Sequence, residues 1–337
     1  MIRRIIALLL ALSLFAPWAL ADSMPEPVYS GIAQTTVRIR PEMSMDAEPV
    51  GIYQKESSVK ILSYEPAWLE VIQGTEESWV RGYIPRHTVD NVTALKPDVL
   101  PYGALPATYT ALVTRDVLLQ RSPEDKTSPL TTVKKGARLA ILSIENGWAK
   151  VLYWRQYGYL YVDNLTDLSP VYDVQSAESG DTIAAFISFY NTDEKELTQN
   201  RMKNIAQACY YISITMGLGD QLDFDGTAGP YRPARGYLEG MSYYEGVPAI
   251  STGGGVCQVS STLYNVLLCL PEGMQILFRR AHGPSGATYL PHGVDAAVGN
   301  ERLNLVFRNR FEFPVRIQAE AHEGTLFIEM IKEQVNE

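Results

Sequence analysis

Short segments in which apolar and polar residues alternate occupy the first half of the chain. Two examples are SVKILS at residues 58–63 and AWLEVI at residues 67–72. A period of two is typical of a half-buried β-strand, and Gly, Pro and Asp residues bound these segments. Because no helical period runs through this half, we expect it to consist of short strands.

The strand pattern occurs twice. The tripeptide ILS at 61–63 and the following Trp68 recur as ILS at 141–143 and Trp148, about 80 residues later. Each copy has enough short strands for a small five- or six-stranded barrel. We expect one barrel at residues 31–93 and a second at 108–168. Residues 94–107 contain three prolines and a glycine and are predicted to link them.

The pattern changes at about residue 180. A strand is predicted at 182–190, and a helix at about 197–216 that ends at Gly217 and Gly219. A second helix follows the glycines at 253–255. Its apolar positions fall on one face, since they are spaced by three and four residues: Val259, Leu263, Val266, Leu267 and Leu270.

After this second helix the strand pattern returns. Strands are predicted at residues 274–280, 287–290, 303–308, 315–319 and 325–331. Two helices followed by a mostly antiparallel sheet form an α+β domain, which we place at residues 180–335. The expected architecture is therefore multidomain, with two small all-β barrels followed by an α+β domain.

Composition and charge narrow the class of protein. Hydrophobic residues make up 46% of the chain and charged residues 20%, which is typical of globular proteins. The formal net charge is −9, and no run of basic residues offsets it. A nucleic-acid partner is therefore not expected.

The N-terminus predicts a secretory signal peptide at residues 1–21. Arg3 and Arg4 precede an apolar core at residues 5–14, and Ala19-Leu20-Ala21 provides small residues for cleavage. An uncleaved N-terminal anchor is the alternative. No later segment has the ~18 apolar residues of a membrane span, so the mature chain is expected outside the cytoplasmic membrane without a span.

The chain has three cysteines, and an odd number in a secreted protein leaves at least one thiol unpaired. Cys257 and Cys269 would lie roughly 18 Å apart along one helix, too far to form a disulfide. We expect Cys209 and Cys269 to fill the core.

Cys257 is the candidate nucleophile. It lies in the first turn of the predicted helix, where free backbone N–H groups and the helix dipole favour a thiolate over a thiol. The preceding glycines let a ligand or another part of the backbone come close. The structural alternative is a small buried thiol after a glycine turn.

Residues 253–265 (GGGVCQVSSTLYN) resemble the signature of the VanW family. Further parts of the family pattern follow in order over roughly the C-terminal 140 residues: Asn200-Arg201, Asn204-Ile205, Asp223-Phe224-Asp225, Gly229-Pro230, Arg235-Gly236-Tyr237, His282, Tyr289, Pro291, Gly293, Asp295-Ala296, Leu305, Phe307, Arg308-Asn309 and Pro314. The family is named after an accessory gene of vancomycin-resistance clusters. The resemblance implies a VanW domain and a cell-envelope setting rather than a particular reaction.

The two predicted barrels resemble bacterial SH3-like domains, in the order of a strand ending R-x-x-P, a hairpin with W-x-x-V and a final Gly-Tyr pair. Such domains often occur on cell-wall enzymes and bind wall polymers or peptides. Several aromatic residues are therefore candidates for a binding face: Trp68, Trp79, Trp148, Tyr157 and Tyr159. For Trp68 and Trp148 we favour a position in the barrel core.

His282 and Asp295 correspond to the histidine and aspartate of the VanW pattern. The chain order Cys257, His282, Asp295 is similar in arrangement to papain-like and transglutaminase-like enzymes, where histidine is the base and the carboxylate orients it. Gln258 and the N–H groups of residues 253–257 are candidate oxyanion donors. Each residue also has a structural alternative, such as a loop hydrogen bond or a turn cap.

Other residues of the signature are candidates for ligand binding: Gly254, Gly255, Gln258, Ser260, Ser261 and Tyr264. No metal is predicted, because the histidines and cysteines lack close ligand spacing. No cofactor is predicted either, since the glycines at 253–255 are not followed by the Lys-Ser/Thr of a phosphate loop.

Two hypotheses follow for a secreted protein associated with the cell wall. In the first, Cys257 carries out acyl transfer or hydrolysis, in the manner of an amidase, on wall peptides, with peptidoglycan or a wall peptide as partner. In the second, the protein binds or organises the wall without catalysis, and Cys257 only shapes a pocket.

Overall fold

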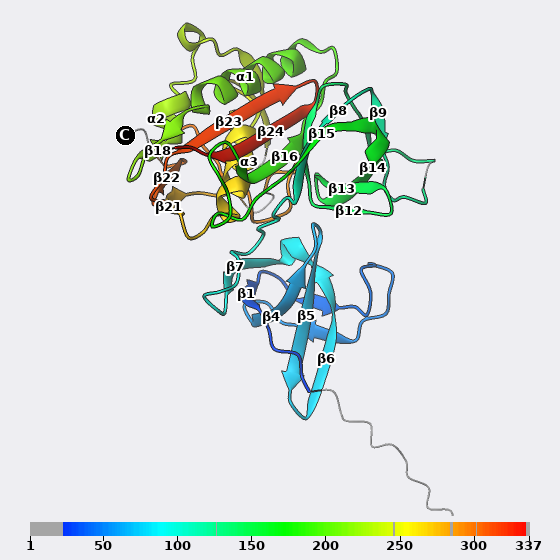
Figure 1. The fold of residues 1–337 in the computed structure, drawn as a ribbon. Coiled ribbons are helices and arrows are strands. Elements are labelled where there is room, and N and C mark those ends of the chain that lie inside the picture. The colour runs from blue at the N-terminus through cyan, green and yellow to red at the C-terminus, as the bar shows by residue number, and fades with distance from the viewer. Residues whose placement is uncertain (1–22, 126, 245–246, 284–285, 301, 335–337) are drawn as a thin grey trace, which may run out of the picture.

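The structure is a computed structural model, and it describes residues 23–125, 127–244, 247–283, 286–300 and 302–334 (Figure 1). The predicted signal peptide at 1–21 lies outside these residues. Within the described ranges, no helix combines the length and the apolar character that a membrane crossing requires.

The first β unit comprises the strands from β1 to β7. An antiparallel sheet has the order β6-β5-β4-β1-β7, and β2 and β3 form a separate ribbon. A 3-10 turn at Arg86–Thr88 precedes the last strand. The bounds are β1 Tyr29–Ala33, β2 Val37–Ile39, β3 Gly51–Tyr53, β4 Ser58–Tyr64, β5 Trp68–Thr75, β6 Ser78–Pro85 and β7 Val89–Ala94.

The second β unit comprises the strands from β8 to β15, and these strands follow the same order as those of the first unit. Its sheets are β11-β8-β15, β12-β13-β14 and the ribbon β10-β9. A 3-10 turn at Val162–Asn164 again precedes the last strand. The bounds are β8 Tyr109–Val113, β9 Val117–Leu119, β10 Thr131–Val133, β11 Arg138–Ile141, β12 Ser143–Glu145, β13 Trp148–Tyr153, β14 Gln156–Tyr161 and β15 Leu165–Pro170.

The two units are rich in β-structure, as predicted, but the described strands form several small sheets and no closed barrel. In the second unit the ladder breaks at Leu142, where β11 ends and β12 begins, so one long strand is shared between two sheets. In the first unit, the register shifts between Ile61 and Ser63 where β4 pairs with β5. Such irregularities bend a strand out of a continuous ladder.

The Gly-Tyr pair near the end of each unit allows the ribbon to approach the sheet. Arg40 bridges to Tyr83, which follows Gly82, and Gln120 bridges to Tyr159. A Cβ at Gly158 would lie 2.6 Å from Leu119 Cγ, so only glycine fits there.

The tryptophans of the units lie outside the cores, contrary to the favoured prediction. Trp68 and Trp148 are half-buried, whereas their neighbours Leu69 and Ala149 are fully buried. Successive side chains of a strand point to opposite faces, so the core face belongs to the positions next to each tryptophan.

The C-terminal part contains the helices. It has a sheet of order β16-β24-β23-β17, a sheet of order β18-β22-β21 and a separate hairpin of β19 and β20. Helix α1 packs on β23 and β19, and α3 packs on β16 and β24 (Figure 1). The bounds are β16 Thr182–Phe189, α1 Glu196–Ile212, β17 Thr215–Met216, β18 Gln221–Asp223, α2 Phe224–Ala228, β19 Glu239–Tyr244, β20 Val247–Thr252, α3 Val256–Leu268, β21 Met274–Arg279, β22 Leu305–Asn309, β23 Val315–His322 and β24 Thr325–Lys332. A further 3-10 turn spans Pro233–Arg235.

Two predicted elements need correction. The helix predicted to reach residue 216 ends at Ile212, because the Ser213 hydroxyl bonds the Cys209 carbonyl (2.8 Å) and Thr215–Met216 pairs with β23 instead. The strand predicted at 287–290 is wrong. These residues form irregular coil in the long loop between β21 and β22, where Gly286 and Gly293 have positive φ.

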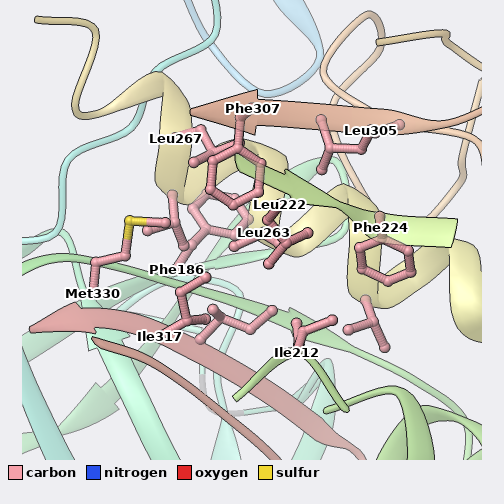
Figure 2. Packing of buried hydrophobic residues seen from close by; sticks show 14 of the residues in the cluster. Phe186, Ile212, Leu222, Phe224, Leu263, Leu267, Leu305, Phe307, Ile317 and Met330 are labelled. Carbon is pink, nitrogen blue, oxygen red and sulfur yellow. The ribbon is translucent and has the colours of Figure 1, made fainter. Parts of the chain in front are cut away.

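The core of the C-terminal part lies between its helices and sheets (Figure 2). Leu263 and Leu267 of α3 contribute to it and are fully buried, as the helical spacing predicts. Other members come from distant elements: Phe186, Ile212, Leu222, Phe224, Leu305, Phe307, Ile317 and Met330. The three cysteines are free thiols, and Cys209 lies in this core as expected.

The second β unit shares its core with the C-terminal sheet. Ile187 and Phe189 of β16, together with Phe327 of β24, belong to the cluster that fills the second unit. The first β unit has a hydrophobic cluster of its own. The segment predicted as a linker is packed against the molecule, since Ala104 and Ala107 are buried.

Candidate active site

The glycines before α3 place Cys257 at the start of the helix. Gly253 and Gly255 have φ values of 85° and 112°, which favour glycine over any residue with a Cβ. A Cβ at Gly254 would lie 2.5 Å from the carbonyl of Gly240, so this position also requires glycine. The chain can therefore turn tightly and start α3 at Val256, one residue before the cysteine.

Cys257 is partly exposed and lines a cleft. Its Sγ lies 3.4 Å from the carbonyl oxygen of Val298. As a first-turn residue it carries a backbone N–H without a partner inside the helix, next to the positive end of the helix dipole.

His282 and Asp295 lie together beside this cysteine. Asp295 Oδ2 accepts two hydrogen bonds from His282, one from the backbone N–H and one from Nδ1, each 2.6 Å long. Cys257 lines the same cleft as His282, and its interaction with the ring raises the pKa of the histidine. Because Asp295 holds Nδ1, Nε2 is the ring nitrogen left for the sulfur. The structure thus brings the three predicted catalytic residues together.

The surroundings shift the pKa of His282 and that of Asp295 in opposite directions. Burial lowers the pKa of His282, but hydrogen bonds to Asp295 and Cys257 and their charges outweigh it and raise the pKa to about 10. Burial raises the pKa of Asp295, yet the hydrogen bonds from His282 and the charges of His282 and Arg279 bring it below its ordinary value. The arrangement therefore favours an imidazolium bound to the Asp295 carboxylate.

His282 and Asp295 belong to the loop between β21 and β22, residues 280–304, and the described residues around them form no regular strand. Its backbone carbonyls accept hydrogen bonds from side chains elsewhere in the chain, as buried polar groups require. The donors come from α3, from Arg279, and from one arginine in each β unit. The acceptors are the carbonyls of Ala287, Leu290, His292, Gly293, Val294, Asp295, Ala296 and Val298.

The polar face of α3 fixes one side of this loop. Asn265 Nδ2 donates to the Val294 carbonyl (2.7 Å), and the hydroxyls of Ser260 and Ser261 bond the backbone of Ala296 (2.6–3.2 Å). These side chains are fully buried. They hold the segment that carries Asp295.

The residues predicted to bind ligand therefore separate into three groups. Gly254, Gly255 and Gln258 line the cleft, and Ser260 and Ser261 contact the loop instead. Tyr264 lies under the Arg279 guanidinium, 4.7 Å from ring centroid to Cζ, and lines a separate cavity of about 510 Å³.

The Gln258 side chain is committed to structural contacts. It accepts a 2.6 Å hydrogen bond from Arg201 and donates to Ser188 and to the Phe189 carbonyl. The N–H groups of Gly253, Gly254 and Val256 also donate to backbone carbonyls. The predicted oxyanion donors are thus reduced to the N–H groups of Gly255 and Cys257.

The cleft has a volume of about 1680 Å³. Its walls include the hairpin β19-β20, the start of α1, and the segment after α2 that carries Tyr231. The Tyr231 hydroxyl donates to Asp225 Oδ1 (2.5 Å), while Asp225 Oδ2 accepts from Gly299 N–H. Burial is the main cause that raises the pKa of Asp225.

The sequence prediction missed several residues of the site. Trp154 lines the cleft from the second β unit, stacked on Tyr153 with centroids 5.3 Å apart. Arg279 bonds the carbonyls of Asp295 and Gly293. The sequence carried one signal for Trp154. Two-residue hairpin turns prefer Gly, Asn or Asp, and the turn between β13 and β14 has tryptophan and arginine instead.

Among the described residues, no group of three or more His, Cys, Asp and Glu side chains could hold a metal ion.

Two solved structures from Trichomonas vaginalis share 13% identity with the chain. NlpC2 matches 57% of this chain and 59% of its own, and NlpC1 matches 94% and 96%, each with a TM-score of 0.17. An NlpC/P60 family protein from Bacillus cereus matches 91% of this chain and 99% of its own, at 12% identity and a TM-score of 0.19. At such TM-scores, these likenesses support no inference about fold or function.

The sequence comparisons are more specific. An uncharacterized protein of Bacillus subtilis (strain 168), YoaR, is 27% identical over 154 residues. This match covers 45% of the chain and 48% of the relative, so the chain spans about half of the relative's length. A family model described as "VanW like protein" matches residues 200–331, which include Cys257, His282 and Asp295. Residues 200–331 of this chain are therefore a VanW family domain.

Proposed function

We propose that this is a cell-wall-related protein that uses Cys257 for acyl transfer or hydrolysis on wall peptides outside the cytoplasmic membrane. The observation that carries the proposal is the geometry of His282, which bonds Asp295 through Nδ1 (2.6 Å) and has its other ring nitrogen for Cys257. The VanW domain match supplies the wall-related setting. The basic start, apolar core and cleavage site at residues 1–21 support export.

In the proposed reaction, the Cys257 thiolate attacks the carbonyl carbon of an amide. The new S–C bond and the oxyanion form together, and the N–H groups of Gly255 and Cys257 are the donors for the developing charge. Imidazolium Nε2–H of His282 then protonates the leaving amine as the C–N bond breaks, which leaves a thioester on Cys257.

The second half of the reaction releases the acyl group. Neutral His282 takes a proton from water, or from another nucleophile, as it attacks the thioester carbonyl. The C–S bond breaks and the thiolate returns with the imidazolium. Asp295 keeps Nδ1 protonated throughout, so that Nε2 is free to exchange the proton.

The test is the thioester itself. The purified protein is mixed with peptidoglycan fragments at neutral pH, quenched in acid and weighed intact by mass spectrometry. An added mass equal to an acyl fragment is expected in the wild type and in Cys269→Ala, and is expected to be absent in Cys257→Ala. Release of fragments with no adduct, and unchanged in Cys257→Ala, would contradict a cysteine mechanism.

We also propose that the two β units bind the wall, as SH3-like units. Two features support this proposal. Both units have the same order of strands, ribbon and 3-10 turn, and their sequence motifs resemble those of bacterial SH3-like domains. Sedimentation of the protein with purified sacculi is expected to be unchanged by Cys257→Ala.

A second candidate is wall binding without catalysis. It is favoured by the 3.4 Å contact between Cys257 Sγ and the Val298 carbonyl, because only a protonated thiol donates to a carbonyl. Under this hypothesis Cys257 is unreactive, and Cys257→Ala keeps every property of the wild type.

A further inference from the structure

The turn between β13 and β14 connects the second β unit to the loop that carries His282 and Asp295. Its two central residues are Trp154, which has a φ of 56°, and Arg155. Arg155 Nε donates to the Leu290 carbonyl and Nη2 to the Ala287 carbonyl, both at 3.1 Å. A positive φ in a bulky residue is an unusual backbone state, and it directs consecutive side chains to the cleft and to the loop.

Arg155 contacts a part of the loop whose described residues belong to no strand or helix. Residues 287–290 form coil, so their carbonyls depend on side-chain donors. Arginine suits this task because its planar, permanently charged fork presents several donors in fixed directions. One side chain can therefore fix two carbonyls three residues apart.

Arg155 also comes close to Asp295. A Cβ at Gly286 would lie 3.3 Å from His292 Nδ1, 3.8 Å from Arg155 Nη2 and 3.9 Å from Asp295 Oδ1, so these three side chains converge on one glycine. The guanidinium and the carboxylate interact electrostatically. Arg155 thus contacts the backbone before Asp295 and faces its side chain.

We propose that Arg155 is a positioning residue of the cysteine site: it holds residues 287–290 so that Asp295 and His282 face Cys257. The second β unit then completes the site in addition to any binding of the wall. This inference rests on the proposed function, since it concerns the geometry of the same three residues.

The pKa of His282 provides a readout with a defined sign. Removing the positive charge of Arg155 would by itself make an imidazolium nearby easier to form, and so raise the pKa of His282. Losing the alignment with Asp295 and Cys257 would lower it. A lower pKa of His282 in an Arg155 variant therefore indicates lost positioning, because the loss of charge alone would raise it. The other ionisable groups around the pair stay the same in each variant: Cys257, Tyr264, Arg279, Tyr289, His292 and His87.

The experiment uses the full-length protein with isotopically labelled histidine and follows His282 by NMR against pH. Its signal is identified by its absence in His282→Gln. The variants are Arg155→Gln, Arg155→Lys and the matched control Arg121→Gln, an exposed arginine of the same β unit whose guanidinium bonds Gln156. Circular dichroism at each pH establishes that the variants are folded.

We expect the pKa of His282 to be well above 6.5 in the wild type and in Arg121→Gln. It should fall by about one unit or more in Arg155→Gln, and by less in Arg155→Lys, which keeps the charge but reaches one carbonyl. If Arg155→Gln does not fold, the change in the pKa of His282 in Arg155→Lys tests the positioning role instead.

Two results would overturn the inference, and they are distinguishable. A raised wild-type pKa that stays the same or rises in both Arg155 variants removes the positioning role and leaves the proposed function standing. A wild-type pKa near 6.5 means that the three residues are not aligned in solution, which overturns the proposed function and this inference with it.

Discussion

At the scale of single residues, the buried Asp295 determines how His282 behaves. Its Oδ2 receives both the backbone N–H and Nδ1 of His282, so the ring has one orientation and one tautomer. The hydrogen bonds from His282 and its charge, with the Arg279 guanidinium 3.8 Å from the other carboxylate oxygen, bring the pKa of Asp295 below its ordinary value despite its burial. A histidine fixed in this way can exchange a proton with Cys257.

His282 should make the stability of the protein depend on pH. Its folded pKa of about 10 lies above the ordinary 6.5, so its contribution is fully present below pH 6.5 and is lost as pH rises to about 10. We expect the free energy of unfolding of the wild type to fall by on the order of 3 kcal/mol more than that of His282→Gln over this range. Urea unfolding at several pH values measures both. Parallel curves for the two proteins would contradict the pKa shift.

The proximity of Cys257, His282 and Asp295 was predictable because the order and types of these residues follow a known pattern. Arg279 and Trp154 could not be found in this way. Their roles depend on a coil segment folding back against β21 and against a turn of the second β unit, and the sequence carries no periodic signal for such contacts.

At the scale of elements, α3 has two different buried faces. Its apolar face packs on β16 and β24, and its polar face bonds the backbone of residues 294–298. The helix therefore carries Cys257, the proposed nucleophile, and also fixes the segment that carries Asp295. The buried serine hydroxyls and the Asn265 Nδ2 group are tolerated there because each is hydrogen-bonded.

A substitution of Asn265 tests whether α3 fixes the segment that carries Asp295. Asn265→Ala removes the hydrogen bond to the Val294 carbonyl and leaves that buried group unpaired, at a cost of about 1–3 kcal/mol. We expect the iodoacetamide reaction of Cys257 to slow as well, because Asp295 loses its neighbour's support. Chemical unfolding and the alkylation rate provide the two measurements.

Asn309→Ala is the matched control. Asn309 is also fully buried and donates to the carbonyls of Met216, Gly217 and Phe313, all outside the loop at 280–304. It should lose comparable stability and keep the alkylation rate of the wild type. Equal slowing in both variants would show that destabilisation alone explains the effect.

The helices and strands were predictable from the spacing of apolar residues. The predictions were wrong where the backbone is hydrogen-bonded by side chains and not by a neighbouring strand or helical turn. The alternating pattern located β4, β5, β23 and β24, and the helical spacing located α3. The segment at 287–290 reads as a strand because it is mostly apolar, yet two of its carbonyls bond Arg155 and Leu290 belongs to the core of the C-terminal part. The ends of α1 and the break at Leu142 likewise depend on contacts distant in sequence.

At the scale of the whole molecule, the second β unit and the C-terminal part share one hydrophobic cluster, while the first unit has its own. The first unit nevertheless reaches the same loop. Arg86 is fully buried and donates to the His292 carbonyl (3.0 Å), and His292 Nε2 lies 3.0 Å from Asp90 Oδ1. Both units thus contact the segment between His282 and Asp295.

The shared core predicts how the molecule unfolds. Ile187→Ala leaves a cavity in the cluster common to β16 and the second unit, at a cost of about 2–5 kcal/mol. Hydrogen exchange should accelerate in β11, β13 and β24 together and stay unchanged in β4 and β5. Ile61→Ala, the matched change in the first unit, should give the opposite pattern. Acceleration throughout the chain in both variants would contradict separate cores.

The central claim is that His282 activates Cys257, and the alkylation of Cys257 by iodoacetamide at pH 6.5 tests it most directly. Wild type, His282→Gln and Cys257→Ala are compared, with the modified residue identified by peptide mass spectrometry. The account predicts modification of Cys257 in the wild type at a rate roughly tenfold or more above that of His282→Gln, because the imidazolium stabilises the thiolate. A slow reaction that is the same in both proteins would contradict it and leave a VanW domain whose cysteine has a structural role.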